Sequence, residues 1–302
     1  MLRRLKSYSH SINGLYILFF VSGILTGLSL YFYSEDNYEK NLFEALALDA
    51  GRDKTEYNND SALLLNSLHV VHNAIKSRHD FFNNVGGVKA GLIQPLSVDL
   101  MTGQGACGSY ALVMARLLTE LDIESRIVQM KVGDVFGGHN IVEAKYKDSW
   151  IVVDPLYDLF FTRPDGSLAS FSDVQNNWSY YKQQLPPGYD DRYRYEGVRY
   201  TNWSKVPIIM PALKKILDVF MGKEKADTFS IRTLFLRKFQ VFFVVTLFFQ
   251  ALNIIYIVLY QRKRKSKSKP GVQPQTLPVT EETKANVFVI NPAKTKITIS
   301  PQ

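Results

Sequence analysis

One cysteine, one histidine and one aspartate in the middle of the chain have the residue types and order that thiol chemistry needs. Cys107 is the only cysteine among 302 residues. A cysteine attacks a carbonyl as its thiolate, an adjacent imidazole lowers the thiol pKa and carries the proton, and a third group orients the imidazole. His139 and Asp154 are the candidates for those two roles. Together the three residues predict nucleophilic attack on an acyl carbon.

Glycines surround the cysteine at the predicted start of a helix that runs to about residue 122. A helix N-terminus favours a thiolate, because its backbone dipole carries partial positive charge there. Gly103, Gly105 and Gly108 let the backbone approach a substrate carbonyl closely and leave early helix N–H groups available as oxyanion donors. Cys107 is therefore predicted at a position that supports its reactivity.

The register of a predicted hairpin brings the histidine and the aspartate together. The segments on either side of Lys147-Asp148 are predicted strands joined by a two-residue turn. In that register Asp154 faces Ile141, and His139 lies diagonal to Asp154 on the same face of the sheet. A loop of odd length would place the two side chains on opposite faces.

Three blocks of sequence around these residues resemble the transglutaminase-like superfamily. The resemblance implies a papain-related α+β fold, in which a nucleophile helix packs on an antiparallel sheet. It also implies Cys107 as nucleophile, His139 as base and Asp154 as orienting carboxylate. The blocks, within residues 103–157, are Gly105-Ala-Cys107-Gly-Ser-Tyr110-Ala, Gly138-His139 with Val142-Glu143, and Trp150-Ile-Val-Val-Asp154-Pro155.

Two positions depart from the family pattern. Asn140-Ile141 stands where an Ala-Trp pair is common, which bears on substrate preference. Leu121-Asp122-Ile123 stands where the helix usually ends in a glycine, and Asp tolerates the left-handed conformation needed there. Further candidates for contact with a substrate, each with a packing or turn role as the alternative, are Gln104, Ser109 and Tyr110.

Other elements follow from periodicity. Residues 61–80 repeat apolar side chains at helical spacing and are predicted as a helix. Three further segments have the composition of strands: residues 125–132, 139–146 and 149–154. Residues 155–236 are aromatic and contain prolines; within them only a helix at 212–221 is indicated. Residues 266–302 have the composition of a disordered tail.

Three histidines on the predicted 61–80 helix raise the question of a metal site. Two of them are separated by three positions and share a helix face, but no acid or thiol is placed obviously nearby in the sequence. Solvated or core-edge histidines are the favoured reading, so no metal and no cofactor are expected. The histidines are His69, His72 and His79.

Two uncharged apolar runs are long enough to cross a bilayer as helices. They are residues 14–33 and 239–260, each with aromatic residues near an end, as at a membrane interface. Basic residues precede the first run and follow the second, so both termini are expected in the cytoplasm. The alternatives are a cleavable signal peptide for the first run and a buried core helix for the second.

The domain organisation follows from these two runs. The formal charge of +8 comes from the ends: residues 1–13 carry +3 and residues 261–302 carry +7, which leaves −2 for the middle. Because the folded part is not basic, nucleic acid is not expected as a partner. The expected parts are a basic cytoplasmic N-terminus (1–13), a transmembrane helix (14–33), an extracytoplasmic transglutaminase-like domain (34–238), a second transmembrane helix (239–260) and a basic, disordered cytoplasmic tail (261–302).

Two functions of different classes fit this organisation. The first is a two-pass membrane enzyme that acts on a protein or peptide amide as a peptidase, amidase or transglutaminase. The second is a catalytically inactive binding or scaffold protein of the same fold in cell-envelope or polysaccharide assembly. The bilayer is an expected partner in both.

The predicted topology is tested by reporter fusions to the intact chain. A reporter fused after residue 35 should lie outside the cytoplasm and one fused after residue 270 inside, because the basic residues at both ends resist translocation. Placement of both reporters in the same compartment would contradict the two-pass arrangement.

Overall fold

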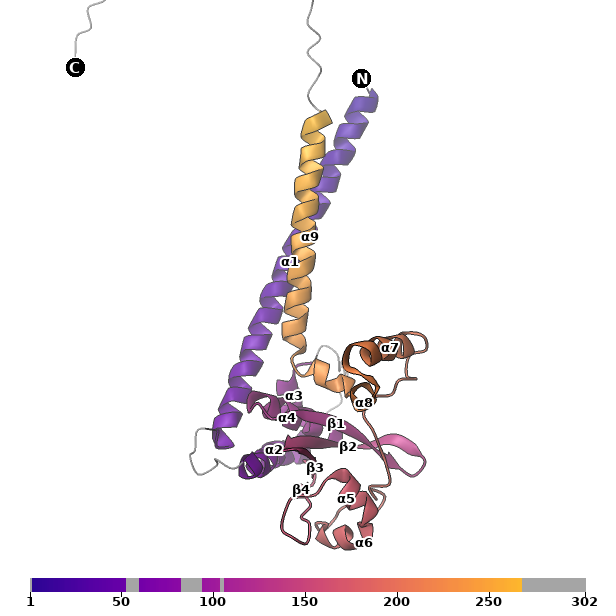
Figure 1. Ribbon diagram of the computed structural model, residues 1–302. Coiled ribbons are helices and arrows are strands. Elements are labelled where there is room, and N and C mark those ends of the chain that lie inside the picture. The colour runs from indigo at the N-terminus through magenta and orange to yellow at the C-terminus, as the bar shows by residue number, and fades with distance from the viewer. Residues whose placement is uncertain (1, 53–59, 83–93, 104–105, 268–302) are drawn as a thin grey trace, which may run out of the picture. The chain divides into compact units, whose positions relative to one another are not determined.

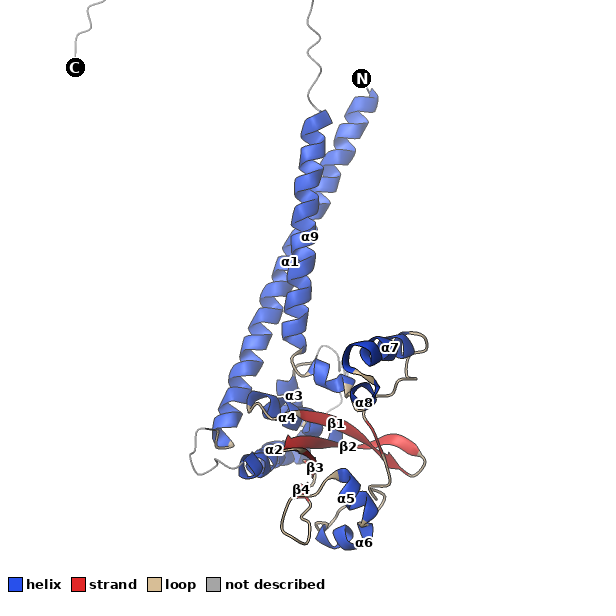
Figure 2. Cartoon of the chain, viewed as in Figure 1, coloured by secondary structure: helices blue, strands red, loops and turns tan. Residues whose placement is uncertain are grey.

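Helices and an antiparallel sheet make up the part of the chain that the structure describes. The structure is a computed structural model, and it describes residues 2–52, 60–82, 94–103 and 106–267. Most of the predicted tail, residues 268–302, lies outside them. The elements (Figure 1 and Figure 2) are α1 (Leu2–Asp49), α2 (Asp60–Phe82), α3 (Leu96–Thr102), α4 (Cys107–Glu120), β1 (Ser125–Val132), β2 (Val135–Tyr146), β3 (Ser149–Asp154), β4 (Leu159–Phe160), α5 (Phe171–Asn176), α6 (Trp178–Tyr181), η2 (Lys182–Gln184), β5 (Val198–Arg199), α7 (Ile209–Met221), α8 (Lys223–Asp227), η3 (Ile231–Phe235) and α9 (Lys238–Lys267).

The five strands among the described residues form one sheet in the order β4-β3-β2-β1-β5, with every neighbouring pair antiparallel. The predicted hairpin register is confirmed, because Tyr146 pairs with Ser149 and Val142 pairs with Val153. Strands β1 and β3 have the predicted bounds. The mixed α+β fold expected from the sequence is therefore observed.

Strand β2 begins at Val135, four residues before the predicted start at residue 139. Gly137 and Gly138, which precede the predicted start, are inside the strand at a bulge where the register with β1 shifts. Gly137 has a φ of +97°, and a Cβ on Gly138 would lie 2.6 Å from the Cβ of Val132. Glycine is needed here because the two strands approach too closely for a side chain.

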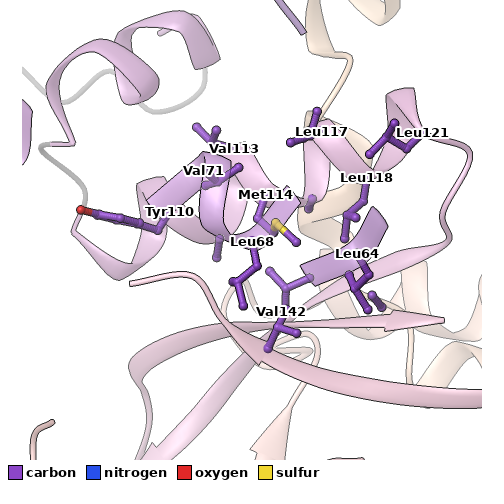
Figure 3. Packing of buried hydrophobic residues seen from close by; sticks show 14 of the residues in the cluster. Leu64, Leu68, Val71, Tyr110, Val113, Met114, Leu117, Leu118, Leu121 and Val142 are labelled. Atoms are coloured by element: carbon purple, nitrogen blue, oxygen red, sulfur yellow. The ribbon is translucent and has the colours of Figure 1, made fainter. Parts of the chain in front are cut away.

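Helices α2 and α4 cover one face of the sheet. All four residues of the stripe predicted on the first of these helices are buried: Leu64, Leu68, Val71 and Ile75. They pack with α4 residues such as Met114 and with side chains of the strands, as Figure 3 shows for Leu68, Met114 and Val142. The predicted helices are thus confirmed, and their apolar faces form the main core.

The opposite face of the sheet is covered by the aromatic segment that the sequence left unassigned. Alternate strand residues such as Met130, Ile141 and Val152 point to this side and are fully buried. The short helices α5 and α6 lie over them. A Ser170 capping box opens α5, with the hydroxyl accepting from the backbone N–H of Asp173. The rings in this layer include Phe161, Phe171, Tyr181 and Tyr195.

Helices α1 and α9 contain the two predicted apolar runs, and both are long and apolar enough to span a membrane. In α9 only 17% of the apolar window is buried, which argues against a buried core helix. The two helices contact each other through polar side chains: Ser29 Oγ donates to Thr246 Oγ1 at 3.0 Å, and Gln250 donates to the hydroxyl of Ser22 at 2.7 Å.

Helix α1 does not end with the apolar run at residue 33. It continues unbroken to Asp49, and its last turns place Phe43 and Ala47 in the main core. The apolar stretch is thus joined to the domain by a continuous helix. This continuation was not predicted, because residues 34–49 mix charged and apolar positions.

The main core gives a stability prediction. Leu68→Ala should lower the free energy of unfolding by about 2–5 kcal/mol, because it leaves a cavity between α2, α4 and the sheet. Met101→Ala removes a side chain that is 52% exposed and serves as the control, with little expected change. Thermal melts of the purified full chain in detergent measure both variants; equal melting temperatures would contradict the packing described here.

Candidate active site

Cys107 is the first residue of α4 and is half-buried. The preceding residue, Ala106, has a φ of 44° and a ψ of −128°, which is a costly conformation for a residue with a side chain. Among the residues that the structure describes, no side chain caps this end of the helix. The thiol therefore lies at a helix N-terminus on a strained turn, where the positive end of the helix dipole favours the thiolate.

His139 and Asp154 form a fully buried pair beside the thiol. His139 Nε2 lies 2.6 Å from Asp154 Oδ2, and both side chains are 0% exposed. The other carboxylate oxygen accepts the backbone N–H of Leu156 at 3.2 Å. As the hairpin register predicts, the two residues share one face of the sheet. The structure thus brings all three predicted residues together.

The electrostatics of the site favour a charged thiol and a charged imidazole. Burial raises the pKa of the Cys107 thiol, but the His139 imidazole and the Asn140 amide outweigh it, so the pKa lies below its usual value. Burial lowers the pKa of His139, yet the Asp154 carboxylate and the Cys107 thiol raise it to about 9. A thiolate and an imidazolium therefore stabilise each other over the pH range between these two pKa values.

Asn140 also contacts the Cys107 sulfur. Its amide Nδ2 donates to Cys107 Sγ at 3.3 Å, and its Oδ1 accepts from Arg232 Nη1 at 2.6 Å. A guanidinium has no acceptor, so the arginine holds the carbonyl end of the amide and leaves the NH₂ end facing the thiol. Arg232 belongs to η3, which lies far along the chain and just before α9.

Tyrosines cover the imidazole. The Tyr193 ring stacks on His139 with centroids 4.2 Å apart and planes 9° from parallel, and Tyr157 meets the imidazole edge-on at 6.0 Å. Tyr189 is buried and packs against both tyrosines. A stacked ring shields the imidazole from water and interacts favourably with its charged form.

The sequence did not identify Asn140, Arg232 or Tyr193 as site residues. Asn140 had a signal, because it stands next to the histidine and differs from the family pattern. Arg232 and Tyr193 had none, since they lie in the segment after the motif whose folding was not assigned. Both reach the site only through the tertiary structure.

The other candidates from the sequence have different surroundings. His69 pairs with Asp158 at 2.6 Å, an acid that the sequence reading did not find, and His72 Nδ1 lies 3.2 Å from the carbonyl oxygen of Pro155. Ser109 Oγ donates to Asp99 at 2.6 Å, and Tyr110 is buried in the main core. Gln104 and the side chain of His79 lie outside the described residues. Among the described residues no three His, Cys, Asp or Glu side chains gather as metal ligands.

A family model agrees with the fold and with the predicted resemblance. Residues 77–155 match the model of the transglutaminase-like superfamily. The match begins earlier than the motif blocks, within α2, and ends just after Asp154. Comparison with curated proteins and with solved structures finds no match. This chain therefore contains a transglutaminase-like domain, flanked by two apolar helices.

The contact of Arg232 with Asn140 gives a prediction about thiol reactivity. Arg232→Met should free the amide and remove a positive charge near the sulfur, so that the thiol pKa rises and alkylation slows about threefold to tenfold near neutral pH. The rate of iodoacetamide labelling of Cys107 across a pH series measures this. Arg194→Met removes an exposed arginine that donates to the carbonyl oxygen of Asp191, and it should leave the profile unchanged.

Proposed function

We propose that the domain is a thiol-dependent acyl-transfer enzyme that acts on amide bonds through Cys107, His139 and Asp154. The observation that carries the proposal is the fully buried His139–Asp154 pair placed beside a half-buried thiol at a helix N-terminus. A purely structural cysteine needs neither a charged imidazole partner nor a strained turn before it. The transglutaminase-like family match supports the same reading.

The first half of the proposed reaction forms a thioester. The Cys107 thiolate attacks the amide carbon, a sulfur–carbon bond forms, and the carbonyl electrons move to its oxygen. Backbone N–H groups at the start of α4 are the proposed donors to this oxygen, because the first N–H groups of a helix have no acceptor within the helix. As the intermediate collapses, the carbon–nitrogen bond breaks and the leaving nitrogen takes the proton from the His139 imidazolium.

The second half regenerates the enzyme. Neutral His139 takes a proton from water or from an incoming amine, which attacks the thioester carbon. The carbon–sulfur bond breaks, and the thiolate and imidazolium are restored. Water yields a carboxylic acid, as in a peptidase or amidase, and an amine yields a new amide, as in a transglutaminase. Asp154 keeps its charge throughout and holds the ring in one orientation.

We further propose that α1 and α9 anchor the enzyme in a membrane with both termini in the cytoplasm. Two helices of sufficient length and apolar character support the anchoring, and the basic residues at both ends of the chain support the orientation. Residues 34–238 then lie outside the cytoplasm, where a protein or peptide amide is the proposed substrate.

Substitution of the three residues separates catalysis from folding. Cys107→Ala and His139→Ala should each abolish turnover, whereas Asp154→Asn should leave residual activity, about ten-thousandfold below wild type, because the imidazole remains in place. Turnover is followed on the best donor from an acyl-donor peptide library, with intact-mass detection of the thioester and a thermal melt of each variant. Wild-type turnover by Cys107→Ala would refute the proposal.

The pH profile provides a second test. The value of kcat/KM should rise through a thiol pKa below the usual range and fall near pH 9, where His139 loses the proton that the leaving nitrogen needs. In Asp154→Asn the falling limb should move to lower pH, because the carboxylate is what raises the pKa of His139. If the falling limb does not move, Asp154 does not raise the pKa of His139 and this part of the proposal is wrong.

Reactivity of the thiol distinguishes this proposal from an inactive scaffold. Cys107 of the enzyme should alkylate fast near neutral pH and slow when His139 is replaced. If Cys107 of the folded wild-type chain alkylates slowly, and replacement of His139 does not change that rate, the binding or scaffold role is favoured.

A further inference from the structure

Helix α7 exposes apolar side chains to solvent on one side. Its partly buried side is mixed: it carries Met210, Leu213, Leu217 and Met221 together with Lys214, which pairs with Asp218 at 3.4 Å within the helix and with Asp227 of α8 at 2.8 Å. On the apolar side, Val219 is 82% exposed and Phe220 is 83% exposed. None of the residues of α7 is buried. A helix packed on a soluble domain normally exposes charged and polar side chains on its outer side.

The exposed apolar side is continuous and wide. Ile209, Ile216 and Phe220 follow one another at helical spacing, with Val219 beside them. The loop just before the helix also exposes apolar side chains, Val206 and Ile208, the second of which is 84% exposed. Contiguous apolar patches of this kind mark a surface that is covered in the working protein. The apolar stripe is defined here as Val206, Ile208, Ile209, Ile216, Val219 and Phe220.

We propose that α7 lies flat on the lipid bilayer, with the apolar stripe inserted among the acyl chains at the headgroup boundary. This inference goes beyond acyl transfer and rests only on the membrane anchoring proposed above. A large apolar face opposite a charged face is the pattern of helices that lie in the membrane interface. The structure assigns α7 to the same compact unit as α1 and most of α9.

The position of α7 along the chain favours lipid over a partner protein. Only residues 222–237 separate the helix from α9, which begins at Lys238. That connection is short and pinned to the domain, because Ser230 Oγ donates to the carbonyl oxygen of Ile127 at 2.8 Å and Leu236 is buried in the main core. A helix tethered this closely to a membrane-spanning helix remains within reach of the bilayer surface.

The charges around α7 also favour contact with the lipid bilayer. Residues 205–227 contain five lysines and three acids, so the segment carries a positive balance. Lys215 is exposed at the border of the apolar stripe, from where its long side chain can reach headgroup phosphates. Anionic lipid should therefore strengthen the contact through electrostatic attraction added to apolar burial.

The test uses the full chain in vesicles of phosphatidylcholine and phosphatidylglycerol. In a Cys107→Ala background, a fluorescent NBD label is attached to Phe220→Cys on the apolar stripe or to Lys215→Cys at its polar border. Nitroxide lipids labelled near the headgroup should quench the label at 220 at least about twofold more strongly than the label at 215. The same label on Leu247→Cys in α9, with a nitroxide deep in the acyl chains, reports membrane insertion independently.

The outcomes separate the inference from the proposed anchoring. Quenching at 247 together with access of aqueous iodide to the label at 220 would overturn the docking of α7 and leave the anchoring intact. A label at 220 that is shielded from both lipid nitroxide and iodide would also overturn it, since a protein surface would then cover the apolar stripe. Absence of quenching at 247 would refute the anchoring itself.

Discussion

The side chains of Asp154 and His139 are both fully buried, and the site depends on the contact between them. This contact offsets the free-energy cost of burying each charged group. An ionised carboxylate buried alone costs several kcal/mol, and a buried imidazolium is no better placed. At 2.6 Å the two side chains remove most of that penalty, and the pKa of His139 rises as a result. The charged imidazole in turn lowers the pKa of the Cys107 thiol, so the ionisation of the sulfur depends on the contact between His139 and Asp154.

That contact depends on the strand register, and the register depends on the turn at Lys147-Asp148. A shift of one residue in β3 would carry Asp154 to the opposite face, where α4 packs, and would leave a buried charge without a partner. The bulge in β2 and the close approach at Gly138 act at the other end of the same hairpin. Backbone geometry at both ends therefore positions the imidazole.

The two apolar helices and the segments next to them are also part of the structure of the domain. The end of α1 places Phe43 in the core, where the guanidinium of Arg116 on α4 lies over its ring. Just before α9, η3 supplies Arg232 to the amide of Asn140 at the thiol. Helix α4 thus contacts the end of α1, and the thiol is connected through Asn140 to the segment that precedes α9. Helix α7 is the third helix that we propose to contact lipid, through its exposed apolar side.

The sequence alone predicted those features of the fold that depend on residues close together in the chain. The stripe at Leu68 and its neighbours, the two-residue hairpin and the motif around Cys107 depend on spacings of a few residues, so they indicated the helices, the strand register and the approach of His139 to Asp154. Contacts between distant segments were decided only by the tertiary structure. Arg232 meets a residue 92 positions away and His69 an acid 89 positions away, and no periodicity records such a pairing. Packing also decided which side chains of α7 face solvent: Val219 and Phe220 are more than 80% exposed, which the helical spacing of the segment does not record.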